Sequence, residues 1–162
     1  QGHDMQSSLV EEDKIAMAKE ILEGEYAKKI FLPIDVMAAA AFDNAAEHKA
    51  VSLDGVPKDW QVLDIGPETM SFFEQELVSV KTILWNGPMG VFEMSNFAEG
   101  TKAVAKAVAA SPAYSVVGGG DSSAAIRSVG MEDGIDHIST GGGASLKFLE
   151  GKVLPGIAAC CD

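Results

Sequence analysis

Hydrophobic residues between positions 9 and 23 recur every three or four residues, which is the spacing of an amphipathic helix. Ser8 and Glu11 have the spacing of a capping box at the start of this helix. Gly24 follows its last apolar residue, where a glycine in the left-handed conformation commonly ends a helix. A second helical period follows Pro67, a residue type that favours the first turn of a helix.

Short apolar runs bounded by turn residues predict strands around these helices. Residues 30–35, Ile-Phe-Leu-Pro-Ile-Asp, have the composition of a strand that is buried on both faces. Residues 50–53 predict an edge strand, and residues 62–65 predict another short strand. Residues 38–46 favour neither a helix nor a strand.

From residue 82 onward, predicted strands alternate with predicted helices and are joined by glycine-rich turns, which is typical of βαβ units and a parallel sheet. We therefore predict one α/β domain with a Rossmann-like parallel sheet, helices on both faces and three layers, α/β/α. The predicted strands are residues 82–85, 114–117 and 137–139, and the predicted helices are residues 95–110, 122–129 and 144–150.

Composition limits the partners of this domain. The chain has 162 residues, 47% of them hydrophobic, so it can bury a core. Its 12 basic and 24 acidic residues give a net charge of -12, and Arg127 is its single arginine, which argues against nucleic acid as a partner. No long apolar run indicates a membrane span. The adjacent Cys160 and Cys161 would form a strained bridge, so we expect a reducing, cytoplasmic location.

Three unusual loops follow the predicted strands of the second half: residues 86–93, 118–122 and 139–144. Ligands of open parallel sheets bind beyond the carboxyl ends of the strands, where these loops lie. A triple glycine that leads from a strand into a helix exposes backbone N–H groups and the positive end of the helix dipole to an anion. The alternative is that the glycines only permit tight turns, but two such loops on consecutive βα units favour an anion site.

Side chains in these loops leave several chemistries open. Asp121 is either an ordinary N-cap or a ligand for Mg²⁺, and Ser122 could donate to a phosphate. Glu93 could accept hydrogen bonds from ribose hydroxyls while Val91 packs on a base, or it is a solvated carboxylate. Neither glycine loop matches a P-loop or a complete dinucleotide fingerprint. The three histidines lack zinc-ligand spacing, and no serine lies in a hydrolase elbow.

The three loops, in this order and spacing, resemble the C-terminal half of phosphoglycerate kinase. Further similar stretches are residues 8–11, 63–67 and 149–156. The resemblance implies part of a two-domain glycolytic kinase that transfers a phosphoryl group between 1,3-bisphosphoglycerate and MgADP, giving 3-phosphoglycerate and MgATP. It also implies that residues 1–162 are a partial C-terminal, nucleotide-binding domain, without the N-terminal triose-binding domain and the start of the C-terminal domain.

The resemblance also assigns roles to residues of this chain. Leu63, Asn86 and Val91 would surround the nucleoside, and Glu93 would bind the ribose. Four residues of the second loop would hold the phosphates of ADP or ATP, one of them, Asp121, through Mg²⁺; they are Gly119, Gly120, Asp121 and Ser122.

Two backbone amides would act on the phosphoryl group during its transfer, those of Gly120 and Gly143, while Thr140, Gly141 and Gly142 would line the hinge-side rim. This assignment agrees with an amide-lined anion site, because phosphoryl transfer depends mainly on positioning and charge stabilisation.

The chain also departs from the family pattern. The arginines and histidine that grip the triose acid have no counterpart here, and a Gly-Ala-Lys segment that meets the phosphates is missing. Residues 4–8 replace the usual Gly-Lys-Ser entry into the first helix. We therefore expect a fragment that is inactive alone, from an enzyme that is a monomer at full length. The alternatives are a stand-alone nucleotide-binding or regulatory domain, and a remnant that binds nothing.

Overall fold

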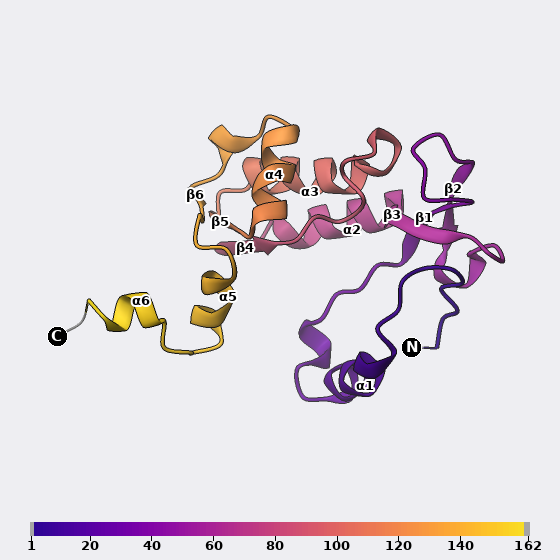
Figure 1. Ribbon diagram of the computed structural model, residues 1–162. Coiled ribbons are helices and arrows are strands. Elements are labelled where there is room, and N and C mark those ends of the chain that lie inside the picture. The colour runs from indigo at the N-terminus through magenta and orange to yellow at the C-terminus, as the bar shows by residue number, and fades with distance from the viewer. Residues whose placement is uncertain (1, 161–162) are drawn as a thin grey trace.

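The computed structural model describes residues 2–160, which form two three-stranded sheets joined by helices (Figure 1). The strands are β1 (Asp35–Ala39), β2 (His48–Ser52), β3 (Gln61–Ile65), β4 (Thr82–Asn86), β5 (Tyr114–Gly118) and β6 (His137–Ile138). The α-helices are α1 (Ile15–Glu23), α2 (Pro67–Leu77), α3 (Glu99–Ala110), α4 (Gly120–Ser128), α5 (Gly143–Leu149) and α6 (Pro155–Ala158). Short 3-10 helices are η1 (Glu12–Lys14), η2 (Ala27–Lys29), η3 (Leu53–Gly55), η4 (Ser95–Phe97) and η5 (Glu132–Gly134).

The second half forms the predicted parallel sheet, in the order β4-β5-β6. Alternate residues of β4, Ile83 and Trp85, are buried on the face that α3 and α4 cover. They pack with Val108 of α3 and Ile126 of α4 in the largest hydrophobic cluster. The parallel sheet with flanking helices is therefore confirmed.

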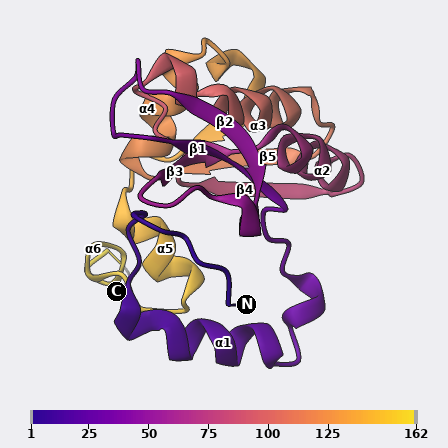
Figure 2. The same cartoon turned by 90° about the vertical axis from the view of Figure 1, so that its right-hand side faces the viewer.

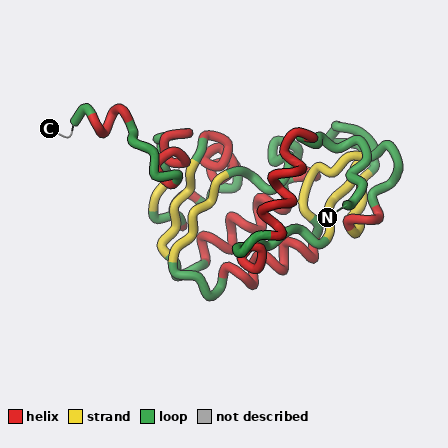
Figure 3. Tube along the Cα trace, turned by 90° about the horizontal axis from the view of Figure 1, so that it is seen from below, coloured by secondary structure: helices red, strands yellow, loops and turns green. Residues whose placement is uncertain are grey.

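Helices lie on both sides of the parallel sheet, but unequally. Figure 2 shows α2, α3 and α4 above the strands and α5 below them, whereas α1, also low in this view, lies to the side of β4, β5 and β6 in Figure 1. Seen from below, the strands of the two sheets lie at opposite sides of the molecule, with helices between them (Figure 3). Leu84 is 45% exposed, although its neighbours in β4 are buried. The lower face of the sheet is therefore partly open to solvent within the described residues.

The first half forms an antiparallel sheet, in the order β2-β1-β3, rather than further parallel strands. β1 pairs with β2 from Asp35↔Ser52 to Ala39↔His48, and with β3 on its other edge. Parallel neighbours need a crossover of a dozen or more residues. Only residues 40–47 separate β1 from β2, so a hairpin forms instead.

The strand predicted over residues 30–35 was wrong: β1 begins only at Asp35 and extends to Ala39, so it ends within the stretch 38–46 for which the sequence favoured no element. Residues 30–34 have no strand assignment, and Phe31 is half exposed. Pro33 has no N–H to donate, and no neighbouring strand pairs with this segment in the part of the chain that the structure describes.

Two predicted helix starts and one helix end also differ. The N-terminal helix begins only at η1, and Ser8 accepts a hydrogen bond from the Val62 N–H (2.9 Å) instead of capping it. Gly24 has a φ of -79°, so the predicted left-handed stop was wrong. α4 begins at Gly120 with Gly119 as its N-cap, so Asp121 lies in the first turn and is not the cap.

Two buried carboxylates connect the antiparallel sheet to helices that pack on the parallel one. Asp35 of β1 accepts hydrogen bonds from the Thr69 N–H (2.7 Å) and the Glu68 N–H (3.1 Å) in the first turn of α2. Asp64 of β3 accepts one from the Gly100 N–H (2.8 Å) in the first turn of α3. Each carboxylate satisfies amides that have no acceptor within their own helix.

Among the described residues, no helix is both long and apolar enough to cross a bilayer. Cys160 is exposed and carries a free thiol. The prediction about a bridge between Cys160 and its neighbour concerns Cys161, which lies outside the described residues.

Candidate functional site

The three glycine-containing loops leave the parallel sheet at one edge. We call residues 86–93 the first loop, 118–122 the second loop and 139–144 the third loop. β4, β5 and β6 are parallel and in register, with Asn86 opposite Gly118. The Ser139 N–H donates to the Val117 carbonyl (2.8 Å), so the third loop begins beside the second. The structure therefore brings the predicted loops together.

The first loop is held by hydrogen bonds to three elements. The Gly87 N–H donates to Ser122 Oγ of α4 (2.5 Å), and the Trp85 ring N–H donates to the Gly87 carbonyl (2.6 Å). The Met89 N–H donates to Oγ1 of Thr101, a fully buried residue of α3 (3.1 Å). These contacts fix the loop as it leaves β4.

The far end of the first loop contacts β3. The Val91 N–H donates to the Leu63 carbonyl (2.9 Å), and both side chains join a hydrophobic cluster with Phe97. Glu93 follows on the exposed surface. The structure thus brings Leu63 and Val91 together, as expected of two residues around one nucleoside. Asn86 lies at the start of the same loop.

The second loop leads directly into α4. Gly119, the N-cap, has a φ of +92°, a conformation that side chains rarely adopt. A Cβ at this position would also lie 3.0 Å from Asn86 Oδ1, so the first and second loops approach closely. The amides at the start of α4 have no acceptor within the helix, and Asp121 is exposed beside them. This end of α4 offers N–H groups and one carboxylate to a ligand.

Ser122 lies differently from its neighbours in the second loop. Its side chain is 1% exposed, and its Oγ accepts the hydrogen bond from Gly87. Its hydroxyl therefore links the first loop to α4 and is directed into the protein. Any contact of Ser122 with a bound anion is accordingly assigned to its backbone N–H.

The third loop, like the second, leads from a strand into a helix through a glycine N-cap, but more of its residues are exposed. Gly142, the N-cap of α5, has a φ of +51°, and α5 begins at Gly143. Ser139 Oγ and Ser145 Oγ form a hydrogen bond (2.7 Å) across the loop. Thr140 lies on the surface between them. The predicted rim residues therefore flank the second loop at the same edge of the sheet.

The described residues contain no group of three or more His, Cys, Asp or Glu side chains that could hold a metal ion alone. Asp121 is a single exposed carboxylate at the start of α4. Mg²⁺ commonly binds through one or two carboxylates together with substrate phosphates. The donor set here therefore fits Mg²⁺ that arrives with a nucleotide.

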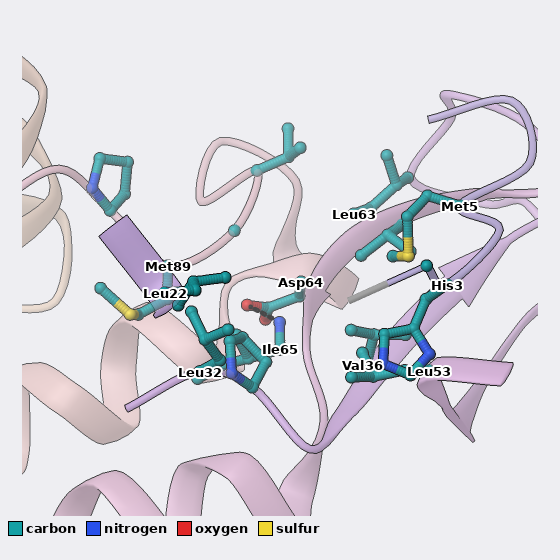
Figure 4. Close-up of a pocket in the computed structure, with 16 residues that line it drawn as sticks. His3, Met5, Leu22, Leu32, Val36, Leu53, Leu63, Asp64, Ile65 and Met89 are labelled. Atoms are coloured by element: carbon teal, nitrogen blue, oxygen red, sulfur yellow. Dashed lines mark hydrogen bonds between the residues drawn. The ribbon is translucent and has the colours of Figure 1, made fainter. Parts of the chain in front are cut away.

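A cavity of about 640 Å³ borders the first loop on the side of β3 (Figure 4). Apolar side chains dominate its lining, including Leu22 of α1, Leu32 and Met89. Asp64 of β3 also lines this cavity, although its side chain is only 3% exposed. The second and third loops do not contribute to it. The first loop thus lies between the cavity and the glycine-rich edge.

Sequence reasoning missed Asp64. Burial raises the pKa of its carboxyl from 3.8 to about 6; hydrogen bonds from the Gly100 and Ile65 amides act in the opposite direction, and the nearby Glu99 raises it further. The sequence did contain a signal for this position, because Asp64 is the one charged residue in the otherwise apolar run of residues 62–65. A buried charge without an opposite partner is unusual and often marks a special position.

Comparison with known proteins identifies the family to which this architecture belongs. The family profile described as phosphoglycerate kinase matches residues 1–152. The chain belongs to the phosphoglycerate kinase family. Among curated phosphoglycerate kinases, that of Corynebacterium aurimucosum is 54% identical over 97% of this chain, and that of Chloroherpeton thalassium is 55% identical over 98%. The match covers 40% and 41% of these two relatives, so the chain spans about two fifths of their length.

Solved structures of the family agree with the fold. Phosphoglycerate kinase from Coxiella burnetii superposes with a TM-score of 0.91 at 40% identity, covering 97% of this chain and 41% of that one. The enzyme from Pyrococcus horikoshii gives a TM-score of 0.79 at 42% identity, covering 91% of this chain and 36% of the other. The expected relation to a two-domain kinase fold is therefore confirmed.

Proposed function

We propose that this chain forms most of the nucleotide site of a phosphoglycerate kinase, and that the whole protein transfers a phosphoryl group between 1,3-bisphosphoglycerate and MgADP. In the direction of ATP synthesis, the bond from phosphorus to the acyl oxygen breaks and a bond to the terminal oxygen of ADP forms. The observation that carries the proposal is the convergence of the three loops at the carboxyl edge of β4, β5 and β6, in a chain of this family.

The first loop would bind the nucleoside. Leu63 and Val91 already contact one cluster and could pack on the base, while Asn86 borders the second loop. Glu93 is exposed at the end of the same loop, so its carboxylate could accept hydrogen bonds from ribose hydroxyls. An apolar face with a few polar groups at its rim is the common design of a nucleoside site.

The second loop would bind the phosphates. The amides of Gly119, Gly120, Asp121 and Ser122 surround the start of α4, where the helix dipole favours an anion. The Asp121 carboxylate would hold Mg²⁺ together with the nucleotide. When bound, this ion neutralises part of the charge on the phosphate oxygens.

The amides of Gly120 and Gly143 would stabilise the phosphoryl group during its transfer. Both residues begin helices at neighbouring strands of the same sheet. N–H groups fixed by the fold stabilise charge without reorganisation during the reaction. Thr140, Gly141 and Gly142 would form the rim that faces the rest of the enzyme. The triose acid would bind outside the described residues.

Calorimetric titration of the full-length gene product with ADP at several Mg²⁺ concentrations tests the proposal. We expect saturable binding, with a Kd on the order of micromolar to millimolar. Asp121→Ala should weaken binding of the Mg²⁺ complex by about tenfold, the effect of about one lost ionic contact. Asp133→Ala, which removes an exposed carboxylate of η5, is the matched control and should leave binding unchanged. Unchanged affinity of the Asp121 variant at every Mg²⁺ level would refute its role.

We extend the proposal to the cellular location and the oligomeric state of the protein. A stand-alone nucleotide-binding domain is not favoured, because the relatives described above are phosphoglycerate kinases. We propose a cytoplasmic enzyme that is monomeric at full length. The same titration of the isolated chain of 162 residues addresses the alternative that this chain binds nothing, because it would then give no saturable heat.

A further inference from the structure

Asp64 is a buried carboxylate to which the proposed reaction assigns no role. Its strand, β3, is otherwise apolar at this point, with Leu63 and Ile65 both buried beside it. Its oxygens accept hydrogen bonds from the Ile65 N–H and the Gly100 N–H, both at 2.8 Å. Among residues 2–160, no basic side chain donates a hydrogen bond to it. A charge buried at such a place needs a structural or functional reason.

The backbone of the first loop presses directly on this carboxylate. A methyl group added at Gly90 would lie 2.3 Å from Asp64 Oδ1, and its three nearest atoms would all belong to Asp64. Gly90 does not have a positive φ, so glycine is required here for space and not for conformation. The carboxylate therefore sets how closely the loop approaches β3.

The residue after Gly90 is one that we propose to contact the nucleoside. The Val91 N–H donates to the carbonyl of Leu63, the neighbour of Asp64 on β3. In Figure 4 the Asp64 carboxylate points from β3 toward the side of the cavity where Met89 lies. The side chain of Asp64 and the backbone of Leu63 thus hold two consecutive residues of the first loop.

We propose that Asp64 is a positioning residue for the nucleotide site, which fixes Gly90 and through it the nucleoside contacts of Val91 and Glu93. Its carboxylate also bonds to the first turn of α3, so β3, α3 and the first loop meet at one side chain. The inference rests on the proposed nucleotide site, but its structural part, the ordering of the first loop, can be measured without a nucleotide.

Asp35 supplies a matched control. It is also buried, lies on the antiparallel sheet and accepts hydrogen bonds from the first turn of a helix. A methyl group at Gly66 would lie 2.1 Å from Asp35 Oδ2, just as one at Gly90 would press on Asp64. Gly66 precedes α2 and is not part of the three loops. Both aspartates therefore accept hydrogen bonds at the start of a helix. Of the two, Asp64 is the one that contacts the first loop.

The first experiment compares Asp64→Asn and Asp35→Asn in the full-length gene product. Asparagine keeps the shape but turns an N–H₂ group toward one of the donor amides. We expect Asp64→Asn to raise the KM for ADP by about tenfold with kcat changed by less than about twofold, the pattern of lost nucleotide binding. Asp35→Asn should leave this KM unchanged. Equal KM values in wild type and Asp64→Asn would overturn the inference.

Hydrogen exchange of the first loop measures positioning directly. In the protein without nucleotide, the Val91 amide should exchange about tenfold faster in Asp64→Asn than in wild type or in Asp35→Asn, because the loop opens more often. Unchanged exchange at Val91 would also overturn the inference. If exchange accelerates but wild type binds no MgADP, the positioning role holds and the proposed function fails.

A second pair of substitutions tests the inference if Asp64→Asn does not fold. One adds a methyl group at Gly90, and the other removes the side chain of Asp64. Gly90→Ala should raise the KM for ADP, because the new methyl group displaces the loop. Asp64→Gly removes every atom that this methyl group would meet most closely. The double variant should therefore bind ADP more tightly than additive effects of the two single changes predict. Additive effects would show that the two positions act independently and would contradict the inference.

Discussion

Three aspartates illustrate, at the scale of single residues, how position decides the behaviour of one side chain. Asp64 is buried, and its pKa is raised from 3.8 to about 6, chiefly by burial. Asp136 is exposed, and the backbone N–H and hydroxyl of Ser115 lower the pKa of its carboxyl (both contacts 2.8 Å). Asp121, also exposed, lies beside free amides of α4. The same residue type thus serves a packed interior, a strand anchor and a candidate ligand site.

The opposite shifts predict opposite dependences of stability on pH. Between pH 3.8 and about 6, the folded protein holds the Asp64 proton more tightly than the unfolded chain. Raising the pH through this window therefore lowers the free energy of unfolding, by at most about 3 kcal/mol. Asp136 contributes stability above its ordinary pKa, and this contribution is lost as the pH falls through its lower folded pKa.

Urea denaturation of wild type and Asp64→Asn at pH 4.5 and pH 7.5 measures the first effect. Asparagine does not titrate, so the stability of the variant relative to wild type should rise between these two pH values by about 2 kcal/mol, because the unfolded carboxyl is already mostly ionised at pH 4.5. A stability difference between the two proteins that is the same at both pH values would contradict a raised pKa of Asp64.

At the scale of elements, the structure depends on how α2 and α3 are attached to the antiparallel sheet. Thr69, in the first turn of α2, has a fully buried side chain. Its Oγ1 accepts hydrogen bonds from the Ile34 and Asp35 amides (both 3.0 Å) and donates to the Asp35 carboxylate (2.6 Å). One hydroxyl thus fixes the start of β1 against α2. The corresponding joint of α3 is Asp64.

Thr69→Val keeps the shape of this side chain and removes its hydroxyl, leaving two amides and a carboxylate short of a partner. We expect the free energy of unfolding to fall by about 2 to 3 kcal/mol, measured by urea denaturation of the full-length gene product. Thr101→Val is the matched control, since the hydroxyl of this buried residue accepts one loop amide, that of Met89. Its cost should be about 1 kcal/mol. Equal losses in the free energy of unfolding for the two variants would contradict the importance of the additional hydrogen bonds of Thr69.

At the scale of the whole molecule, the net charge of -12 argues against nucleic acid as a partner, because the acidic surface repels its phosphate backbone. The structure places glycine loops with backbone amides at the edge where an anion would bind. Charges farther than about 8 Å are largely screened at physiological salt, whereas amides act at contact distance. An acidic surface is therefore compatible with the proposed nucleotide site.

The isolated chain of 162 residues should not transfer phosphoryl groups. It spans about two fifths of the length of these relatives, and we propose that the triose acid binds outside the described residues. A coupled assay of the purified chain should give no turnover above background, while the full-length gene product is active under the same conditions. Turnover of the isolated chain close to that of the full-length protein would contradict the proposal.

The sequence by itself determined the alternation of strands and helices from residue 82 onward and the three loops between them. These features depend on local periodicity and on glycine at strand ends, which neighbouring residues decide. The same stretches carried the resemblance to the family. Leu63 and Val91 were also named from the sequence, but through the resemblance and not through any local pattern.

Only the tertiary structure decided the antiparallel first sheet, the start of β1 and the contact between Asp64 and the first loop. Asp64 meets Gly100 across 36 positions of the chain, and Gly87 meets Ser122 across 35. Local propensity cannot specify which distant backbone will close on a side chain. Residues 30–34 show the same limit, because a strand forms only where another strand pairs with it, whatever its own composition.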